Sequence, residues 1–160
     1  MQIYLLRHGI AADATPGKSD FERPLTAEGK RELRTLLQFA FKAGVKPSLL
    51  LSSPYLRALE TAQIAESELE CAGGILETRA LVPSGDPSDV WLEIRSHKEE
   101  KSILLASHEP LMGVLLGYLL GGHNLMVDFK KGAMARVDVD SIPSQPRGVF
   151  KWMIHPKMLR

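Results

Sequence analysis

Short apolar runs alternate with polar breaks along this chain. The first run, residues 3–6 (Ile-Tyr-Leu-Leu), leads directly into residues 7–9 (Arg-His-Gly). A continuous apolar run of this length predicts a strand buried on both faces. Similar runs at 48–52 and 102–107 predict two more buried strands, and a weaker run at 75–81 predicts another. Each of the three clear runs ends at polar residues, so each predicted strand delivers polar side chains to one edge of a sheet.

Helical spacing of apolar residues appears between these runs. Thr26 is a good amino-terminal cap, and apolar residues recur after it at i, i+3, i+4, i+7 and i+8, from Leu33 to Phe41, before Gly44 ends the helix. Proline favours the first position of a helix, which predicts that Ser53 caps a helix beginning at Pro54. Arg57 then lies in the first turn of that helix and leans back toward the sheet edge. Two further helices are predicted after Asp86, with Pro87 at its first position, and at Pro110, where the helix is apolar nearly all round.

The order of these elements predicts the fold class. Strands that alternate with helices indicate a three-layer α/β/α sandwich with a mostly parallel central sheet. Two late apolar runs, 134–139 and 149–154, flank a turn rich in Ser, Pro and Gly, and they predict an antiparallel hairpin at the edge of the sheet. We expect a single domain over residues 1–160.

Polar residues from three separate strand ends are expected to meet. Arg7 and His8 follow the first strand, Ser53 and Arg57 follow the second, and His108 follows the fourth. The carboxyl ends of parallel strands share one edge of a sheet, where open α/β folds bind their ligands. The long polar stretch 11–24 comes directly after the first of these strand ends, and a loop of that length favours a functional role.

The converging side chains favour a phosphoryl group as the ligand. Two guanidiniums and two imidazoles in one crevice repel one another unless an anion lies between them, and the arginine fork suits phosphate. Phosphoryl transfer depends mainly on positioning and on stabilising charge, which Arg7 and Arg57 can provide without a metal. A neutral His8 held in one tautomer is a competent nucleophile. Gly9 would leave room for the phosphate, and His108 would donate to its oxygens or position water.

Composition excludes several classes of partner and cofactor. The formal net charge is +1 with scattered Lys and Arg, which suggests neither nucleic acid nor a membrane surface as a partner. The lone Cys71 cannot form an intramolecular disulfide, so we expect a cytoplasmic protein. Separately, we expect a monomer. His97, His123 and His155 lack metal-ligand spacing. We therefore expect no metal and no other cofactor.

These motifs resemble the signature of the histidine phosphatase superfamily, which has the phosphoglycerate mutase-like fold. The loop-to-helix motif further resembles the small SixA-type branch of phosphohistidine phosphatases. The resemblance implies that His8 is the phosphorylated nucleophile, that Arg7, Arg57 and His108 form the phosphate pocket, and that Arg23 is a peripheral contact. The motif residues are 7–9 (Arg-His-Gly), 53–58 (Ser-Pro-Tyr-Leu-Arg-Ala) with Thr61 and Ala62, 107–108 (Ser-His), and 23–26 (Arg-Pro-Leu-Thr) with Gly29. We assign Gly9, Ser53 and Glu109, together with Arg23, to substrate binding.

The chain departs from the larger members of that superfamily in lacking a clear acidic proton donor and any lid insertion. Asp86 is the best candidate donor, although it is also explained as a helix cap; Glu77 and Asp89 are weaker. An open site without an acid suits phosphohistidine on a protein, because a protonated phosphoimidazole is a good leaving group. The expected partner is thus a phosphorylated protein such as a histidine phosphotransfer domain.

Two alternatives remain open from the sequence. The chain could be a phosphatase or mutase for a small phosphorylated metabolite or sugar phosphate. It could also be a non-catalytic module that recognises a phosphorylated partner, although binding alone does not require a nucleophile at His8.

Overall fold

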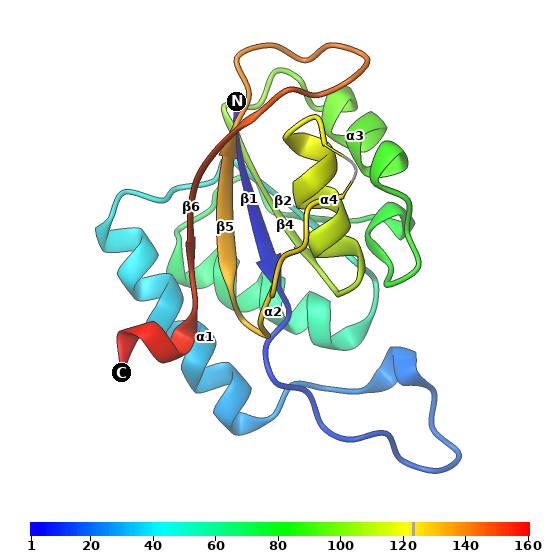
Figure 1. The fold of residues 1–160 in the computed structure, drawn as a ribbon. Helices are drawn as coiled ribbons and strands as arrows, with labels where there is room; N and C mark the ends of the chain where they lie inside the picture. Colours follow the sequence, from blue (N-terminus) through cyan, green and yellow to red (C-terminus); the bar gives the residue numbers. More distant parts are fainter. Residues whose placement is uncertain (123) are drawn as a thin grey trace.

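A six-stranded mixed sheet forms the centre of the computed structural model, which describes residues 1–122 and 124–160 (Figure 1). The strand order is β3-β2-β4-β1-β5-β6, and the first four of these strands are mutually parallel. The hairpin contributes one antiparallel strand, β5, so that β6 at the edge again runs in the common direction. The strands are β1 (Gln2–Arg7), β2 (Leu49–Ser52), β3 (Ile75–Glu77), β4 (Ser102–Ser107), β5 (Met134–Asp138) and β6 (Val149–Ile154).

Helices cover both faces of this sheet, as a strand that is apolar on both of its faces requires. Ile3 and Leu5 of β1 point into one hydrophobic cluster, which includes residues of α3 (Pro87–Ser96) and α4 (Leu111–Leu119). Tyr4 and Leu6 point into the other cluster, which includes residues of α1 (Ala27–Lys42) and α2 (Leu56–Glu68). Successive side chains of a strand face opposite ways, so one buried run serves two cores. The predicted three-layer α/β/α architecture is confirmed.

The predicted boundaries of α1 and α3 are confirmed by their caps. The Thr26 hydroxyl accepts a hydrogen bond from Gly29 N at 3.0 Å, and Gly44 after the helix has φ +90, a conformation that favours glycine. The Asp86 carboxylate accepts from Ser88 N at 2.8 Å, with Pro87 at the first helical position. Both caps satisfy backbone N–H groups that a helix leaves without an internal partner.

The prediction for the start of α2 is wrong by two residues. The helix begins at Leu56 and its cap position is Tyr55, whose backbone is extended. Ser53 accepts from Tyr55 N at 3.3 Å, and its hydroxyl also contacts His108. This hydroxyl therefore holds a turn that precedes the helix. The weaker strand is also shorter than predicted: β3 ends at Glu77, and a 3₁₀ helix at Arg79–Leu81 follows it.

The stretch 11–24 lies beyond the carboxyl end of β1 (Figure 1). A β-bridge between Ala11 and Leu25 closes its base, and a short 3₁₀ helix, Asp20–Glu22, forms its return arm. Another short 3₁₀ helix, Pro156–Leu159, follows β6. Within the described ranges, no helix combines the length and the apolar character needed to cross a membrane.

Candidate active site

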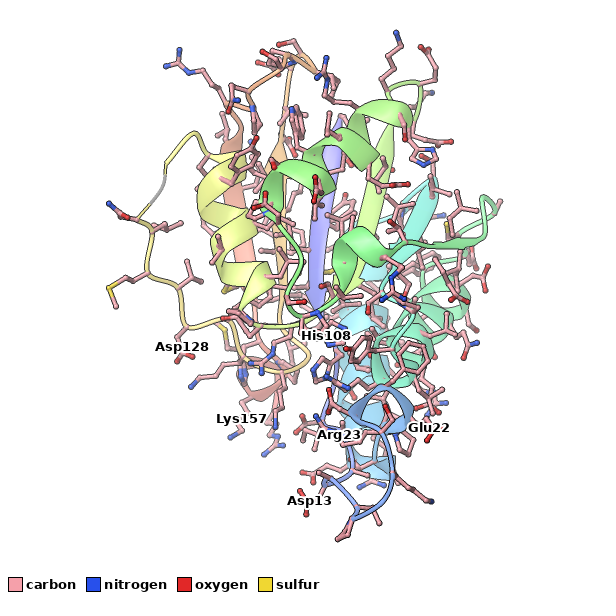
Figure 2. All side chains as sticks on the ribbon, turned by 90° about the vertical axis from the view of Figure 1, so that its right-hand side faces the viewer. Asp13, Glu22, Arg23, His108, Asp128 and Lys157 are labelled. Carbon is pink, nitrogen blue, oxygen red and sulfur yellow. The ribbon has the colours of Figure 1, made fainter. Side chains whose placement is uncertain are left out.

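Three parallel strands bring the predicted residues to one edge of the sheet. Arg7 pairs with Ser107 across β1 and β4, and Ser52 pairs with Ala106 across β2 and β4. The residues that follow these strand ends therefore emerge side by side. Figure 2 shows His108 at this end of the sheet, with Arg23 below it, Glu22 to its lower right, and Asp128 and Lys157 to its left.

His8 is buried at the centre of this group. Its Nδ1 lies 2.7 Å from the carbonyl oxygen of Gly9, and its Nε2 lies 3.3 Å from Nε of Arg57. A carbonyl can only accept, so Nδ1 carries the proton and Nε2 keeps a lone pair. The ring centroid of His108 is 5.1 Å from that of His8. The fold thus fixes the tautomer of His8 and presents one unprotonated nitrogen to the pocket.

Both buried histidines are neutral at physiological pH. Burial away from water lowers the pKa of His8 to about 4, assisted by the positive charges of Arg57, Arg7 and Lys131. Burial lowers the pKa of His108 to about 3, assisted by His8 and Arg57. A desolvated imidazole beside fixed cations resists protonation. His8 is therefore available as a base or nucleophile.

Arg57 joins the loop to the sheet edge. Its Nη1 donates to the carbonyl oxygen of Asp20 at 2.9 Å, and its Nη2 lies 3.2 Å from Oδ2 of the same residue. Nε of Arg23 donates to the other carboxylate oxygen of Asp20 at 2.7 Å. Burial raises the pKa of Asp20, but the hydrogen bond from Arg23 and the charge of Arg57 outweigh this effect, so the pKa is lowered. Asp20 is thus an ionised bridge between the two arginines.

The sequence analysis missed Asp20. It lies in a polar loop where several acidic residues look alike, and only its spacing of three residues from Arg23 hinted at a local pair. The contact with Arg57 joins residues 37 positions apart and depends on how the loop folds back.

Arg7 lies next to His8 but faces a different segment. Its Nη1 donates to the carbonyl oxygen of Phe129 at 2.7 Å. Its Nε is buried, and none of the described residues accepts from it. Burial lowers the pKa of Arg7, whereas the charge of Glu109 acts in the opposite direction. Arg7 therefore retains an unused donor at the sheet edge.

His108 is held by Ser53. Its Nε2 lies 2.8 Å from the Ser53 hydroxyl, which accepts from Tyr55 N. The Ser53 hydroxyl has one proton and a second lone pair, so it can serve Nε2 either as donor or as acceptor, and the other ring nitrogen of His108 is Nδ1. That nitrogen is buried, and the described part of the chain offers it no partner. The structure thus brings Ser53 into the predicted group through His108.

Two predicted substrate-binding residues have other contacts. A Cβ at Gly9 would lie 2.8 Å from Cδ1 of Leu33 and 3.2 Å from the Gly29 carbonyl, so glycine is required here by packing against α1. The Glu109 carboxylate accepts from Gly113 N at 2.6 Å in the first turn of α4. Packing against α1 is thus a further reason for glycine at position 9, and the Glu109 carboxylate satisfies a backbone N–H in the first turn of α4.

The carboxylate of Asp86 is engaged elsewhere. It is exposed at the start of α3, and its hydrogen bonds to Ser88 lower its pKa. Among the described residues, no hydrogen bond or ion pair joins Asp86 to His8, Arg57 or His108. A carboxyl group that ionises easily and lies outside the group is poorly placed to be the predicted proton donor.

Two further histidines of the described residues lie at helix ends. His97 caps the end of α3, His155 caps the 3₁₀ helix Pro156–Leu159, and His123 lies outside the described residues. No cluster of three or more His, Cys, Asp or Glu that could hold a metal ion occurs in the part of the chain that the structure describes.

Comparisons with known proteins point to one family. A sequence profile of the histidine phosphatase superfamily (branch 1) matches residues 3–79. The chain is 32% identical to phosphohistidine phosphatase SixA of Escherichia coli (strain K12), covering 100% of this chain and 97% of the relative. It is 34% identical to the phosphohistidine phosphatase SixA homolog of Haemophilus influenzae, covering 78% and 80% of the two chains. A solved structure of the protein histidine phosphatase SixA with tungstate matches with a TM-score of 0.90 and 31% identity over the full length of both chains.

Proposed function

This chain belongs to the histidine phosphatase superfamily, and from that membership we propose that it hydrolyses phosphohistidine on a protein through a phosphorylated His8. The observation that carries the proposal is the fixed tautomer of His8. Its protonated Nδ1 donates to the carbonyl oxygen of Gly9, and its unprotonated Nε2 accepts from Nε of Arg57 at 3.3 Å. This nitrogen is the atom that would attack phosphorus.

Charge stabilisation in this mechanism comes from side chains. Arg57 and Arg7 would bind the equatorial oxygens of the phosphoryl group, where negative charge develops during transfer. His108, whose Nδ1 carries the proton when Nε2 accepts from Ser53, would donate to the same group. The solved SixA structure is a complex with tungstate, which like phosphate is a tetrahedral oxyanion, and this supports an oxyanion as the ligand of the present chain. Arg23 would contact the substrate at the rim, beyond Asp20.

The reaction would proceed in two steps. In the first, the lone pair of His8 Nε2 forms a bond to phosphorus. The bond from phosphorus to the imidazole nitrogen of the substrate breaks, and its electron pair remains on that imidazole. In the second, the oxygen of a water molecule forms a bond to phosphorus, and the bond from phosphorus to His8 Nε2 breaks with its electron pair returning to Nε2. Both water protons leave with the product as dihydrogen phosphate, and His8 is again a neutral imidazole with its proton on Nδ1.

The nature of the leaving group supports phosphohistidine as the substrate. A protonated phosphoimidazole leaves as neutral imidazole, whereas an alcohol leaving from a phosphomonoester needs a proton from a general acid. Asp86, the best candidate acid in the sequence, is exposed and ionised at the start of α3. Asp20, which contacts Arg57, is likewise held ionised by Arg23 and Arg57. Neither carboxyl group is thus set to protonate an alcohol, which favours phosphohistidine over sugar phosphates. The similarity to phosphohistidine phosphatase SixA over the full chain points the same way.

Trapping of the intermediate tests this proposal. Brief incubation with a ³²P-labelled phosphohistidine protein should leave acid-labile, base-stable phosphate on the wild-type enzyme and none on His8→Ala. His97→Ala, which changes a histidine at the far end of α3, should retain the label. Initial rates for phosphohistidine protein, phosphoserine peptide and sugar phosphate, measured in parallel, should be highest for the first.

Two outcomes would replace the proposal by its alternatives. Cleavage of phosphomonoesters at an equal or higher rate would make the chain a metabolite phosphatase. Absence of both label and turnover in the wild type would leave a phosphate-binding module.

A further inference from the structure

A basic cleft lies beside the proposed phosphoryl site. It has a volume of about 260 Å³, and Arg7, Glu32, Lys130, Lys131, His155 and Lys157 line it. We refer to these residues as the basic cleft. In Figure 2, Lys157 lies below His108 and to its left, and Arg23 lies directly below His108. Arg7 lines the cleft, whereas Arg57 contacts Asp20 of the 11–24 loop, so the cleft and the loop adjoin different arginines of the site.

The backbone fixes this cleft against the nucleophile. Gly132 N donates to the carbonyl oxygen of His8 at 3.0 Å, and Arg7 N donates to the carbonyl oxygen of Ala133 at 3.1 Å. The segment that carries Lys131 is therefore anchored to the residues at the site itself. His155 and Lys157 form another part of the cleft lining. The His155 side chain accepts from Lys157 N at 3.0 Å and caps the 3₁₀ helix Pro156–Leu159.

The positive charges of the cleft exceed the negative charges available to them. Glu32 is paired with Arg160, and Lys130 is paired with Asp128 at 2.7 Å. Lys131 and Lys157 are exposed, and among the described residues neither takes part in an ion pair. These two lysines are surplus cations on a chain whose overall formal charge is only +1.

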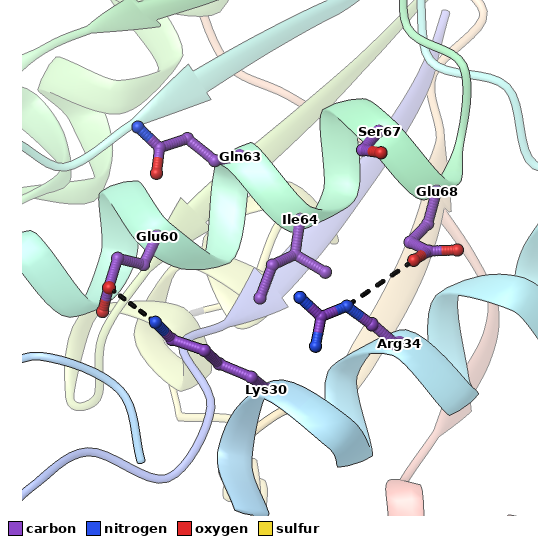
Figure 3. Close-up of a pocket in the computed structure, with 7 residues that line it drawn as sticks. All are labelled: Lys30, Arg34, Glu60, Gln63, Ile64, Ser67 and Glu68. Atoms are coloured by element: carbon purple, nitrogen blue, oxygen red, sulfur yellow. Dashed lines mark hydrogen bonds and ion pairs between the residues drawn. The ribbon is translucent and has the colours of Figure 1, made fainter. Parts of the chain in front are cut away.

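The groove between α1 and α2 is a contrasting case, because its own cations are paired (Figure 3). There, Lys30 lies 2.9 Å from Glu60, and Nε of Arg34 lies 3.8 Å from Glu68. Each cation of that groove thus has an acidic partner from the neighbouring helix. A groove of paired charges stabilises the contact between helices, whereas unpaired cations beside an active site attract an anionic ligand.

We propose that the basic cleft is a docking site for acidic side chains of the phosphorylated protein substrate, next to its phosphohistidine. The proposal rests on the proposed function and adds a specificity determinant to it. Carboxylates on the partner would pair with Lys131 and Lys157 while the phosphoryl group reaches His8. Such complementarity mainly accelerates encounter and selects among partners, and salt screens it.

A pair of matched peptides tests the cleft. Both carry one phosphohistidine; Asp and Glu flank it in the first, and Asn and Gln flank it in the second. The double variant Lys131→Gln/Lys157→Gln should lose about tenfold in kcat/KM for the acidic peptide at low salt, mostly through KM, and much less for the amide peptide. Lys98→Gln/Lys101→Gln is the matched control, because it removes the same charge from exposed lysines beside the amino end of β4.

Direct binding separates this proposal from the proposed function. The unphosphorylated acidic peptide, labelled with a fluorophore, should bind wild type with an affinity that falls as salt rises, and should bind the double variant at least several-fold more weakly. This readout needs no turnover, so it holds even if phosphohistidine proves not to be the substrate. Equal losses for both peptides, or no loss of acidic-peptide binding, would overturn the docking site.

Discussion

The two sides of the candidate active site both present cations, but the loop side pairs its arginines with Asp20, whereas the cleft leaves two lysines without an ion pair among the described residues. On the loop side, Asp20 bridges Arg57 and Arg23 at 3.2 and 2.7 Å. On the side of the basic cleft, Lys131 and Lys157 are exposed, and the described residues supply no acidic partner.

This difference separates two uses of positive charge. A buried guanidinium such as Arg57 needs hydrogen bonds that hold its fork in one geometry, and Asp20 provides them. Exposed ammonium groups on a rim keep their hydration and cost little when unpaired, so they remain available to a partner. We infer that the loop side holds Arg57 in position to bind the phosphoryl group, and that the cleft attracts an anionic partner from a distance.

Removal of Arg57 should have the largest effect. Arg57→Gln takes away the buried fork beside His8, and loss of one such donor typically lowers kcat/KM by about 10²–10³-fold. Arg34→Gln, which removes an arginine from the α1–α2 groove, should change the rate little. Initial rates with the phosphohistidine peptides, together with circular dichroism to verify folding, make the measurement. If Arg57→Gln lowers kcat/KM by less than Lys131→Gln/Lys157→Gln does, the loop side does not position the phosphoryl group as we infer.

Acid should destabilise the folded protein because of the histidines between the two sides. Their pKa values fall from 6.5 to about 4 in His8 and about 3 in His108, so below pH 6.5 the unfolded chain binds protons that the folded chain does not. Stability is therefore lost as pH falls from 6.5 toward 4, by about 1 kcal/mol per pH unit for each histidine. Urea unfolding at several pH values measures this slope.

Two variants sharpen that measurement. His108→Asn should remove about half of the slope, since one of the two buried histidines is gone. His97→Asn, at the end of α3, should leave it unchanged. An unaltered slope in His108→Asn would mean that His108 titrates normally and that the site is wetter than its burial indicates.

Breaking the bridge on the loop side should have the smallest effect. In Asp20→Asn the carbonyl contact to Arg57 remains, but the negative charge that competes with phosphate is gone. The dissociation constant for inorganic phosphate should fall about fivefold, which corresponds to about 1 kcal/mol. Calorimetric titration measures it, with Asp13→Asn on the same loop as the control. Weaker binding in Asp20→Asn would instead show that the carboxylate is needed to hold Arg57.

Much of the fold could be predicted because its signals are local. The buried strands are continuous apolar runs, and α1 and α3 begin at side-chain caps that lie next to their first turns. His8, Arg57 and His108 could be grouped for the same reason, since each stands directly after a predicted strand or at a predicted helix start. The start of α2 was misplaced because the Ser53 hydroxyl contacts His108, a residue 55 positions away.

The sequence by itself thus determined the layers, the meeting of the strand ends and the residues that meet there, because periodicity and caps act within a few residues. Three contacts were decided only by the tertiary structure. Asp20 pairs with Arg57, Arg7 donates to the carbonyl oxygen of Phe129, and Leu33 packs where a side chain at position 9 would lie. The tertiary structure also decided that the carboxyl-terminal 3₁₀ helix places Lys157 beside the site. Those contacts join distant parts of the chain, and the free energy of forming them depends on packing that no local pattern encodes.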